Sequence, residues 1–236
     1  MKCFETVHPD WLPVIQQAMA YMDNDYLKML TMNDHWLPGA ANLFSAFSES
    51  PYSMRYILLG ESPYPRAQSA NGYAFWDAAV DDLWSEKGLN RLVNKATSLR
   101  NLIKMLLVAR GDLSDDVSQT AIATLSKQNL WQTNHQLFRG FLNKGFLLLN
   151  ASLVFEVGKI RLHALYWRPF IEHILRSISH SYTLLLFGKI SGQITLPRAI
   201  PTVMAEHPYN ISFIHNPLVI EWFKPLDLLK ADDGKC

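Results

Sequence analysis

Four short apolar runs along the chain predict the strands of a buried sheet. They cover about residues 55–59, 146–149, 182–187 and 201–205. Each run is nearly continuous in apolar side chains instead of alternating with polar ones, which is typical of parallel strands covered on both faces. The predicted sheet therefore lies at the centre of the fold.

Helical spacing of apolar residues separates these runs. We expect helices over residues 10–32, 89–109, 134–143, 162–178 and 216–230, and a short helix over 40–47. Asp10 is the expected N-cap of the first, and 108–127, where periodicity is weak, is an expected surface excursion. This alternation predicts an α/β fold: a three-layer α/β/α sandwich with a central, mainly parallel four-stranded sheet. No linker or repeat divides the chain, so we expect one domain over 1–236.

Composition and charge narrow the functional classes only slightly. Hydrophobic residues make up 49% of the 236 positions and charged residues 18%, which is the balance of a packed globule. Lys and Arg number 22 against 21 Asp and Glu, for a net charge of +1. Without a basic excess, any phosphate contact must come from a local patch. The composition therefore permits DNA binding without predicting it.

Cysteine content and the termini bear on compartment and cofactors. Cys3 and Cys236 are the two cysteines, and we expect both to be free thiols in a reducing compartment. Two thiols cannot hold an iron–sulfur cluster or a four-thiolate zinc ion, and we expect no cofactor or metal. The N-terminus lacks an apolar secretory region, and no apolar run is long enough for a membrane span. We expect a monomer in the cytoplasm, or the nucleus if eukaryotic, without a membrane partner.

Chemically useful side chains follow three of the predicted strands. The first strand ends at Gly60-Glu61-Ser62-Pro63-Tyr64, followed by the turn and rings of Asn71-Gly72-Tyr73-Ala74-Phe75. The second strand ends at Asn150, and the fourth leads to His207-Pro208-Tyr209-Asn210-Ile211-Ser212. In open parallel sheets, ligand sites form at the carboxyl ends of the strands. These segments are therefore expected to meet in one site.

The same segments, in this order, resemble the uracil-DNA glycosylase superfamily, most closely its classical branch. The resemblance extends over about residues 11–229, with 112–127 unassigned. It implies a DNA glycosylase that flips uracil out of DNA and hydrolyses its N-glycosidic bond, which initiates base-excision repair. It also implies that the partner is uracil-containing DNA.

The resemblance assigns substrate binding to four residues. It implies that Phe75 stacks on the base, Asn150 reads its hydrogen-bonding edge, Tyr64 crowds the C5 position against thymine, and Gly60 begins the motif. Each has an ordinary alternative in the sequence alone. Phe75 and Tyr64 could be packed aromatic residues, and Asn150 could be a turn former or a helix N-cap. For Phe75 the spacing from Gly60 favours the functional interpretation, and we favour it for Asn150 as well. For Tyr64 the flanking Pro63 and Pro65 support either interpretation, since both stiffen the backbone.

DNA contacts are implied at a further set of positions. Ile211 falls where the family inserts an aliphatic wedge, usually Leu, into the duplex. Candidates for phosphate contact are Ser98, Gly188, Lys189 and Ser212. The prolines that the family carries before Ser98 are missing here. Each of these four residues is weak evidence for DNA contact when taken alone.

One departure falls on the catalytic position. The classical branch has Gly-Gln-Asp-Pro-Tyr in the first motif, with the Asp as general base or cation stabiliser, whereas this chain has Ser62 at that place. A serine cannot by itself take a proton from water at neutral pH. Glu61, one position earlier, is the alternative carboxylate. The resemblance also implies that His207 donates a hydrogen bond to a uracil carbonyl oxygen as negative charge accumulates there. The catalytic candidates are therefore Glu61, Ser62 and His207.

Two functions remain open from the sequence. The chain is either an active glycosylase that uses Glu61, or a catalytically weak or inactive homologue that acts as a DNA-binding or scaffold protein. A nucleotide-binding oxidoreductase is a distant third, because Gly60 begins no Gly-x-Gly-x-x-Gly turn. The acidic pairs at 81–82 and 115–116 are expected to be solvated loop charges instead of metal ligands.

Overall fold

A four-stranded parallel sheet forms the middle of the molecule. The computed structural model describes residues 2–33, 35–189 and 200–231, so Cys236 lies outside the described residues. The strands are β1 (Tyr56–Gly60), β4 (Phe146–Asn150), β5 (Thr183–Phe187) and β6 (Thr202–Ala205). Their order across the sheet is β4-β1-β5-β6, and every pairing is parallel. All four predicted strands are confirmed within a residue or two at each end.

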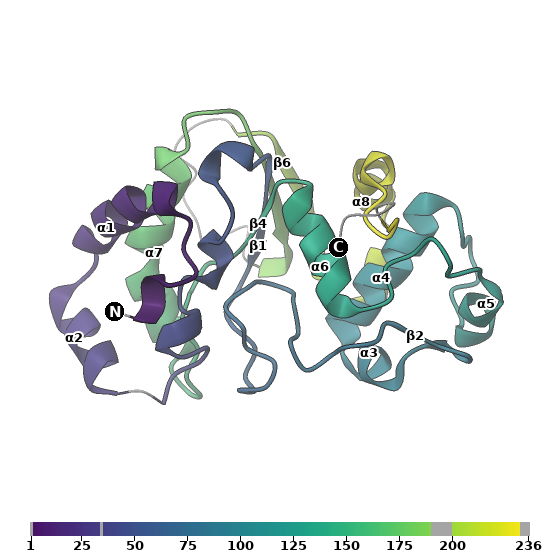
Figure 1. Ribbon diagram of the computed structural model, residues 1–236, viewed down its shortest axis with the longest axis horizontal. Coiled ribbons are helices and arrows are strands. Elements are labelled where there is room, and N and C mark those ends of the chain that lie inside the picture. Colours follow the sequence, from purple (N-terminus) through teal and green to yellow (C-terminus); the bar gives the residue numbers. More distant parts are fainter. Residues whose placement is uncertain (1, 34, 190–199, 232–236) are drawn as a thin grey trace.

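Helices cover both faces of this sheet (Figure 1). They are α1 (Leu12–Ala20), α2 (Asn24–Met32), α3 (Arg91–Lys95), α4 (Thr97–Arg110), α5 (Gln119–Thr124), α6 (Asn134–Asn143), α7 (Ile160–Ser177) and α8 (Pro217–Phe223). Helices α1, α2 and α7 lie on one side, and α4, α6 and α8 on the other. The predicted three-layer α/β/α sandwich is confirmed. None of the described helices is long and apolar enough to cross a membrane.

Side chains alternate between the two faces along each strand, so the hydrophobic core has two parts, one on each face of the sheet. In β1, Ile57 and Leu59 pack in the core on the α1–α7 side, whereas Leu58 between them packs in the core on the α4–α6 side. All three are fully buried. Successive strand side chains point to opposite faces, so a strand covered on both sides must be apolar at every position. This explains the continuous apolar runs of the sequence.

Several predicted helices are shorter than their periodicity indicated. The segment 10–32 contains two helices, because the Asp23 side chain accepts the Tyr26 N–H at 2.8 Å and caps a new helix. Asp10 is not an N-cap; His8 caps the short 3₁₀ turn Pro9–Trp11. The segment 89–109 is divided at Ala96, the residue between α3 and α4.

In other segments, the type of secondary structure differs from the one predicted. Residues 40–47 form two 3₁₀ turns, Ala40–Asn42 and Ser45–Phe47, instead of one helix. The weakly periodic stretch 108–127 contains α5, and a small antiparallel hairpin of β2 (Trp84–Ser85) and β3 (Gly88–Leu89) was not predicted. By contrast, α6 begins and ends as predicted.

The parallel arrangement brings the ends of β1 and β4 together. Gly60 and Asn150 are register partners at the last position of each strand. Beyond them, the Ala151 N–H donates to the Gly60 carbonyl at 2.8 Å, and the Ser152 N–H donates to the Glu61 carbonyl at 3.0 Å. The chain after β4 is thus joined to the first motif at the carboxyl edge of the sheet.

Candidate active site

A pocket of about 200 Å³ lies at the carboxyl edge of the sheet. It brings together eight of the predicted site residues, namely Gly60, Glu61, Ser62, Tyr64, Phe75, Ser98, Asn150 and His207. They come from β1 and the long loop that follows it, β4, α4 and the segment after β6. Residues that are distant in sequence therefore converge as the motif order predicted.

Asn150 is buried in this pocket, with a side chain that is only 2% exposed. Its amide nitrogen Nδ2 has no hydrogen-bond partner among the described residues. A buried donor without an acceptor costs about 1–3 kcal/mol, and a ligand that accepts a hydrogen bond in this pocket would remove that cost. A Cβ atom at Gly60 would lie 2.5 Å from the Asn150 Oδ1 atom. Glycine at the end of β1 is thus required for Asn150 to occupy its place.

Phe75 is held in the pocket by an unusual backbone conformation. Its φ angle is +64°, in the left-handed region, which costs a non-glycine residue about 1–3 kcal/mol. The Tyr64 hydroxyl donates to the Phe75 carbonyl at 3.1 Å, and the neighbouring Ala74 N–H donates to the Leu148 carbonyl at 3.0 Å. The Phe75 ring is half-buried and lines the pocket, so it is not simply a core aromatic.

The ring of Tyr64 lines the same pocket, and burial raises the pKa of its phenol. The hydroxyl therefore stays neutral at physiological pH and keeps the proton that it donates to Phe75.

His207 stacks beside Phe75, with 5.8 Å between ring centroids and 26° between planes. Its Nδ1 accepts the Tyr209 N–H at 3.0 Å, which places the proton of the neutral ring on Nε2. Burial lowers the pKa of His207, against the opposing attraction of the Glu61 carboxylate. The imidazole is thus neutral near pH 7 and offers an Nε2–H donor. Gly188, with a φ of +82°, packs so close that a Cβ there would lie 2.9 Å from the His207 Cβ.

Glu61 and Ser62 occupy the pocket next to these groups. Glu61 is exposed and close enough to His207 to affect its pKa, whereas Ser62 is half-buried. A carboxylate therefore borders the pocket beside the hydroxyl of Ser62. Within the described ranges, no group of three or more His, Cys, Asp or Glu side chains could hold a metal ion.

Of the predicted DNA-contacting residues, Ser98 lines the pocket, and the described Lys189, Ile211 and Ser212 are exposed. Ser98 lines the pocket from the first turn of α4, and Lys189 is exposed after Gly188. Ile211 is 76% exposed at the start of the 3₁₀ turn Ile211–His215. Ser212 is exposed and its side chain hydrogen-bonds to Glu206, which helps to lower the pKa of that carboxyl against the effect of burial.

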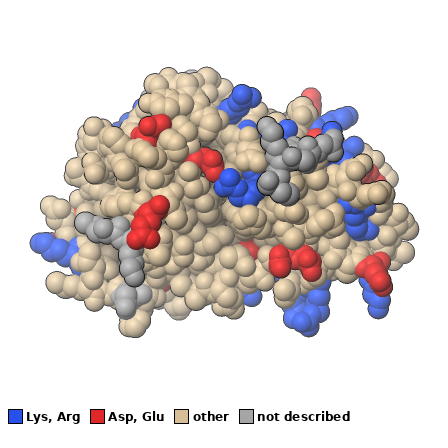
Figure 2. Space-filling model, in the orientation of Figure 1, with Lys and Arg blue, Asp and Glu red and all other residues tan. Residues whose placement is uncertain are grey.

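Surface charge agrees with the near-neutral composition. On the face shown in Figure 2, Lys and Arg are interspersed with Asp and Glu, and the described residues there form no continuous basic stripe. This face therefore offers no extended basic surface to a DNA backbone.

Two aromatic residues of the pocket, Tyr73 and Phe155, were given no role from the sequence. Tyr73 lines the pocket and donates from its hydroxyl to the Ser48 Oγ at 2.9 Å. Phe155 lines it too, and its N–H and carbonyl both pair with Leu37 at 2.9 Å. Tyr73 lies two residues before Phe75, and that spacing was the available signal. Nothing in the sequence marks Phe155 among the apolar residues after Asn150.

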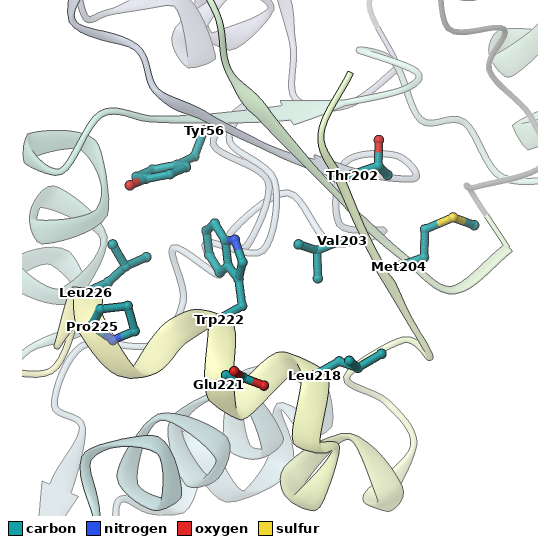
Figure 3. A pocket seen from close by; sticks show the side chains of 9 residues that line it. All are labelled: Tyr56, Thr202, Val203, Met204, Leu218, Glu221, Trp222, Pro225 and Leu226. Atoms are coloured by element: carbon teal, nitrogen blue, oxygen red, sulfur yellow. The ribbon is translucent and has the colours of Figure 1, made fainter. Parts of the chain in front are cut away.

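A second, larger hollow of about 530 Å³ lies away from this site, between β6 and α8 (Figure 3). The Trp222 ring extends from α8 toward Tyr56 and Val203, and it meets the Tyr56 ring edge-on at 5.2 Å. Tyr56 and Thr202 are the first residues of β1 and β6, so the hollow opens at the amino ends of the strands. None of the motif residues lines it.

Curated relatives share extended similarity with this chain. A uracil-DNA glycosylase of Sodalis glossinidius is 24% identical over 232 residues, which cover 95% of this chain and 88% of that protein. The uracil-DNA glycosylase of varicella-zoster virus is 23% identical over 214 residues. These cover 86% of this chain and 60% of the viral protein, so the chain spans less than two thirds of that relative's length. No family model matches the chain.

Solved structures extend the similarity. The crystal structure of wild-type UNG from Nitratifractor salsuginis superposes with a TM-score of 0.91 and 42% identity, covering 96% of this chain and 94% of that one. Mimivirus uracil-DNA glycosylase, with a TM-score of 0.55, 14% identity and coverage of 85% of this chain and 68% of that one, shares the fold. With motifs, pocket and fold in agreement, this chain belongs to the uracil-DNA glycosylase superfamily.

Proposed function

We propose that this protein excises uracil from DNA by hydrolysing its N-glycosidic bond. The observation that carries the proposal is the buried Asn150 amide, whose Nδ2 lacks a partner in a pocket lined by Phe75 and His207. A planar base between such groups is stacked on one face and read on its edge. The proposal is supported by relatives named uracil-DNA glycosylase.

Recognition follows from hydrogen-bond polarity. The Asn150 Nδ2 donates to the C4 carbonyl of uracil, whereas cytosine presents an amino donor at that position, which leaves two donors facing each other. Tyr64 crowds the C5 position and disfavours the methyl group of thymine. Phe75 stacks on the ring of the extruded base.

Cleavage of the N-glycosidic bond needs one group that stabilises negative charge on the base and another that stabilises positive charge on the sugar. As the bond between C1′ and N1 breaks, its electron pair leaves with the base, and the Nε2–H of His207 donates to the carbonyl oxygen on which negative charge gathers. The sugar becomes cation-like, and the Glu61 carboxylate stabilises it. A water oxygen then bonds to C1′, and Glu61 takes the proton that this water releases. Ser62 holds the water by a hydrogen bond.

DNA is bound by a small number of contacts around this pocket. Ser98, Gly188, Lys189 and Ser212 contact backbone phosphates, and Ile211 fills the space that the flipped nucleotide leaves.

A second candidate function rests on Ser62. Without a carboxylate at that position, the pocket binds uracil but hydrolyses it poorly, and the protein acts by binding DNA. Purified protein incubated with a uracil-containing oligonucleotide and then treated with alkali separates the two functions. Strand cleavage at uracil supports the glycosylase, and retention of the oligonucleotide without cleavage supports the binding protein.

The proposed role of Asn150 predicts a change in base selectivity. Asn150→Asp replaces the donor with an acceptor, so excision of uracil should fall by about 10–100-fold, the value of one hydrogen bond in a closed site. The preference for uracil over cytosine should fall with it. Excision is measured on single-stranded oligonucleotides that carry either base. Unchanged selectivity in a folded variant would remove Asn150 from its assigned role.

The exposed wedge predicts a difference between duplex and single-stranded substrates. Ile211→Gly should lower excision from a duplex by about 10-fold, because unstacking a base costs a few kcal/mol that the wedge offsets. Single-stranded substrate has no stack to replace and should be cleaved at the parent rate. The two rates are compared at equal salt concentration. Equal losses on both substrates would contradict a wedge.

A further inference from the structure

Asn101, a residue of α4, contacts the loop that carries His207 and Ile211. Its side chain is 1% exposed, and its Nδ2 donates to the Pro208 carbonyl at 2.7 Å. The same nitrogen lies 3.5 Å from the Tyr209 carbonyl and 3.4 Å from the Asn210 carbonyl. Three successive carbonyl groups thus surround one buried donor.

The Pro208 carbonyl belongs to the same peptide unit as the Tyr209 N–H. A trans peptide is planar, and its C=O and N–H point in opposite directions. On one side, this unit accepts from Asn101 at 2.7 Å; on the other, it donates to the His207 Nδ1 at 3.0 Å. The orientation of the Asn101 amide therefore determines whether the Tyr209 N–H reaches the imidazole.

Further hydrogen bonds hold the side-chain amide of Asn101 and the loop that carries His207 in their orientations. The Arg100 Nε donates to the Asn101 Oδ1 at 3.2 Å, which leaves Nδ2 for the loop. The Asn210 N–H donates to the His207 carbonyl at 2.9 Å, and this closes the turn around Asn101. Ser98, which lines the pocket, precedes Asn101 by one helical turn and so lies on the same side of α4.

We propose that Asn101 is a positioning residue for His207. By holding the Pro208–Tyr209 peptide, it keeps the His207 Nδ1 an acceptor and the proton on Nε2, where the leaving base needs a donor. It also seats the turn from which Ile211 projects. The catalytic role of Asn101 rests on the proposed function. The tautomer and the pKa of the His207 imidazole can be measured whether or not the protein excises uracil.

Asn134 provides a matched control in the same fold. It is also a buried asparagine at a helix, and its Nδ2 donates to the Asp77 carbonyl at 2.8 Å. Among the described residues, its side chain makes no hydrogen bond to the loop of His207. Asn134→Ala and Asn101→Ala each remove a short hydrogen bond from a buried amide to a backbone carbonyl, and only the second touches the proposed positioning contact.

The test is nitrogen-15 NMR of the histidine rings, with uracil excision measured in parallel. The parent should show His207 as the Nε2–H tautomer. In Asn101→Ala the second tautomer should appear, and the pKa of His207 should rise, because the lost Tyr209 N–H bond favoured the neutral ring. Amide exchange at Tyr209 should accelerate about 10-fold or more. The kcat for a single-stranded uracil oligonucleotide should fall about 10–100-fold, with KM changed less than threefold.

Each outcome of these measurements either supports or overturns the assignment of Asn101 as a positioning residue. Asn134→Ala should lower the melting temperature without altering the His207 signals; an equal effect on them would show general loosening and overturn the proposal. Unchanged His207 signals in Asn101→Ala, or an Nδ1–H tautomer in the parent, would also overturn it. Asn101→Asp, which preserves volume but not the donor, serves if the alanine variant does not fold. If the signals move as expected but the parent excises no uracil, the placement of His207 stands and the proposed function fails.

Discussion

Ser62→Asp is expected to raise uracil excision by ~10²–10³-fold, the range that a positioned general base contributes. The half-buried Ser62 lines the pocket beside Glu61, and the motif resemblance implies an Asp at its position in the classical branch. A carboxylate there would face the attacking water and the cation-like sugar. The rate is measured in single turnovers on a uracil oligonucleotide, so that product release does not limit it.

Two further variants show which carboxylate serves in the parent. Ser62→Asn adds a similar volume without charge and should not raise the rate. Glu61→Gln should lower the parent's activity by about 10²-fold or more if Glu61 is the base. A silent Glu61→Gln together with an inert parent and an active Ser62→Asp would favour the DNA-binding function. A fully active parent that neither change affects would contradict the proposed mechanism.

His207→Ala is expected to lower excision by ~10²–10³-fold, the loss measured when one donor to a developing oxyanion is removed. Binding of uracil-containing DNA should change much less, because the negative charge appears only as the bond breaks. Single-turnover rates and equilibrium binding to the same oligonucleotide separate the two quantities. A parallel loss of binding would mean that His207 acts on the ground state instead.

His215 and Glu61 provide controls for this result. His215→Ala removes an exposed histidine from the same segment and should leave excision unchanged. Burial holds the pKa of His207 below 6.5, and attraction by Glu61 partly opposes this, so Glu61→Gln should lower the pKa further. An NMR titration measures both values. A rise in the His207 pKa in Glu61→Gln would contradict the proximity of the two groups.

The sheet was predictable because burial on both faces leaves little freedom in composition. A strand such as β1 must be apolar at each of Ile57, Leu58 and Leu59, and that run is visible without any structure. Asn150 was predictable for a related reason, since a polar residue that ends a buried strand interrupts an otherwise apolar pattern. Helix ends were less predictable. The cap at Asp23 depends on one local hydrogen bond, which periodicity does not report.

Other features of the site arise only from tertiary contacts. Phe75 adopts a left-handed backbone that its bulky side chain disfavours, and the hydrogen bond from Tyr64 that holds it joins two separate turns. Asn101 looks like any polar residue of an amphipathic helix until α4 packs against the loop after β6. Phe155 enters the pocket through its pairing with Leu37, far earlier in the chain. No local pattern encodes these pairings.

The strand order β4-β1-β5-β6 has a consequence for folding. The first strand is central, and its neighbours come from much later in the chain, so loop-closure entropy delays the pairing of Gly60 with Asn150 until the chain collapses as a whole. The segment that carries His207 follows β6, which is the last of the four strands in the sequence. A fragment that lacks β4 or the segment after β6 therefore lacks Asn150 or His207 and part of the base-binding pocket. Excision activity requires all these segments to be assembled, and a ligand of this pocket stabilises the states in which they are.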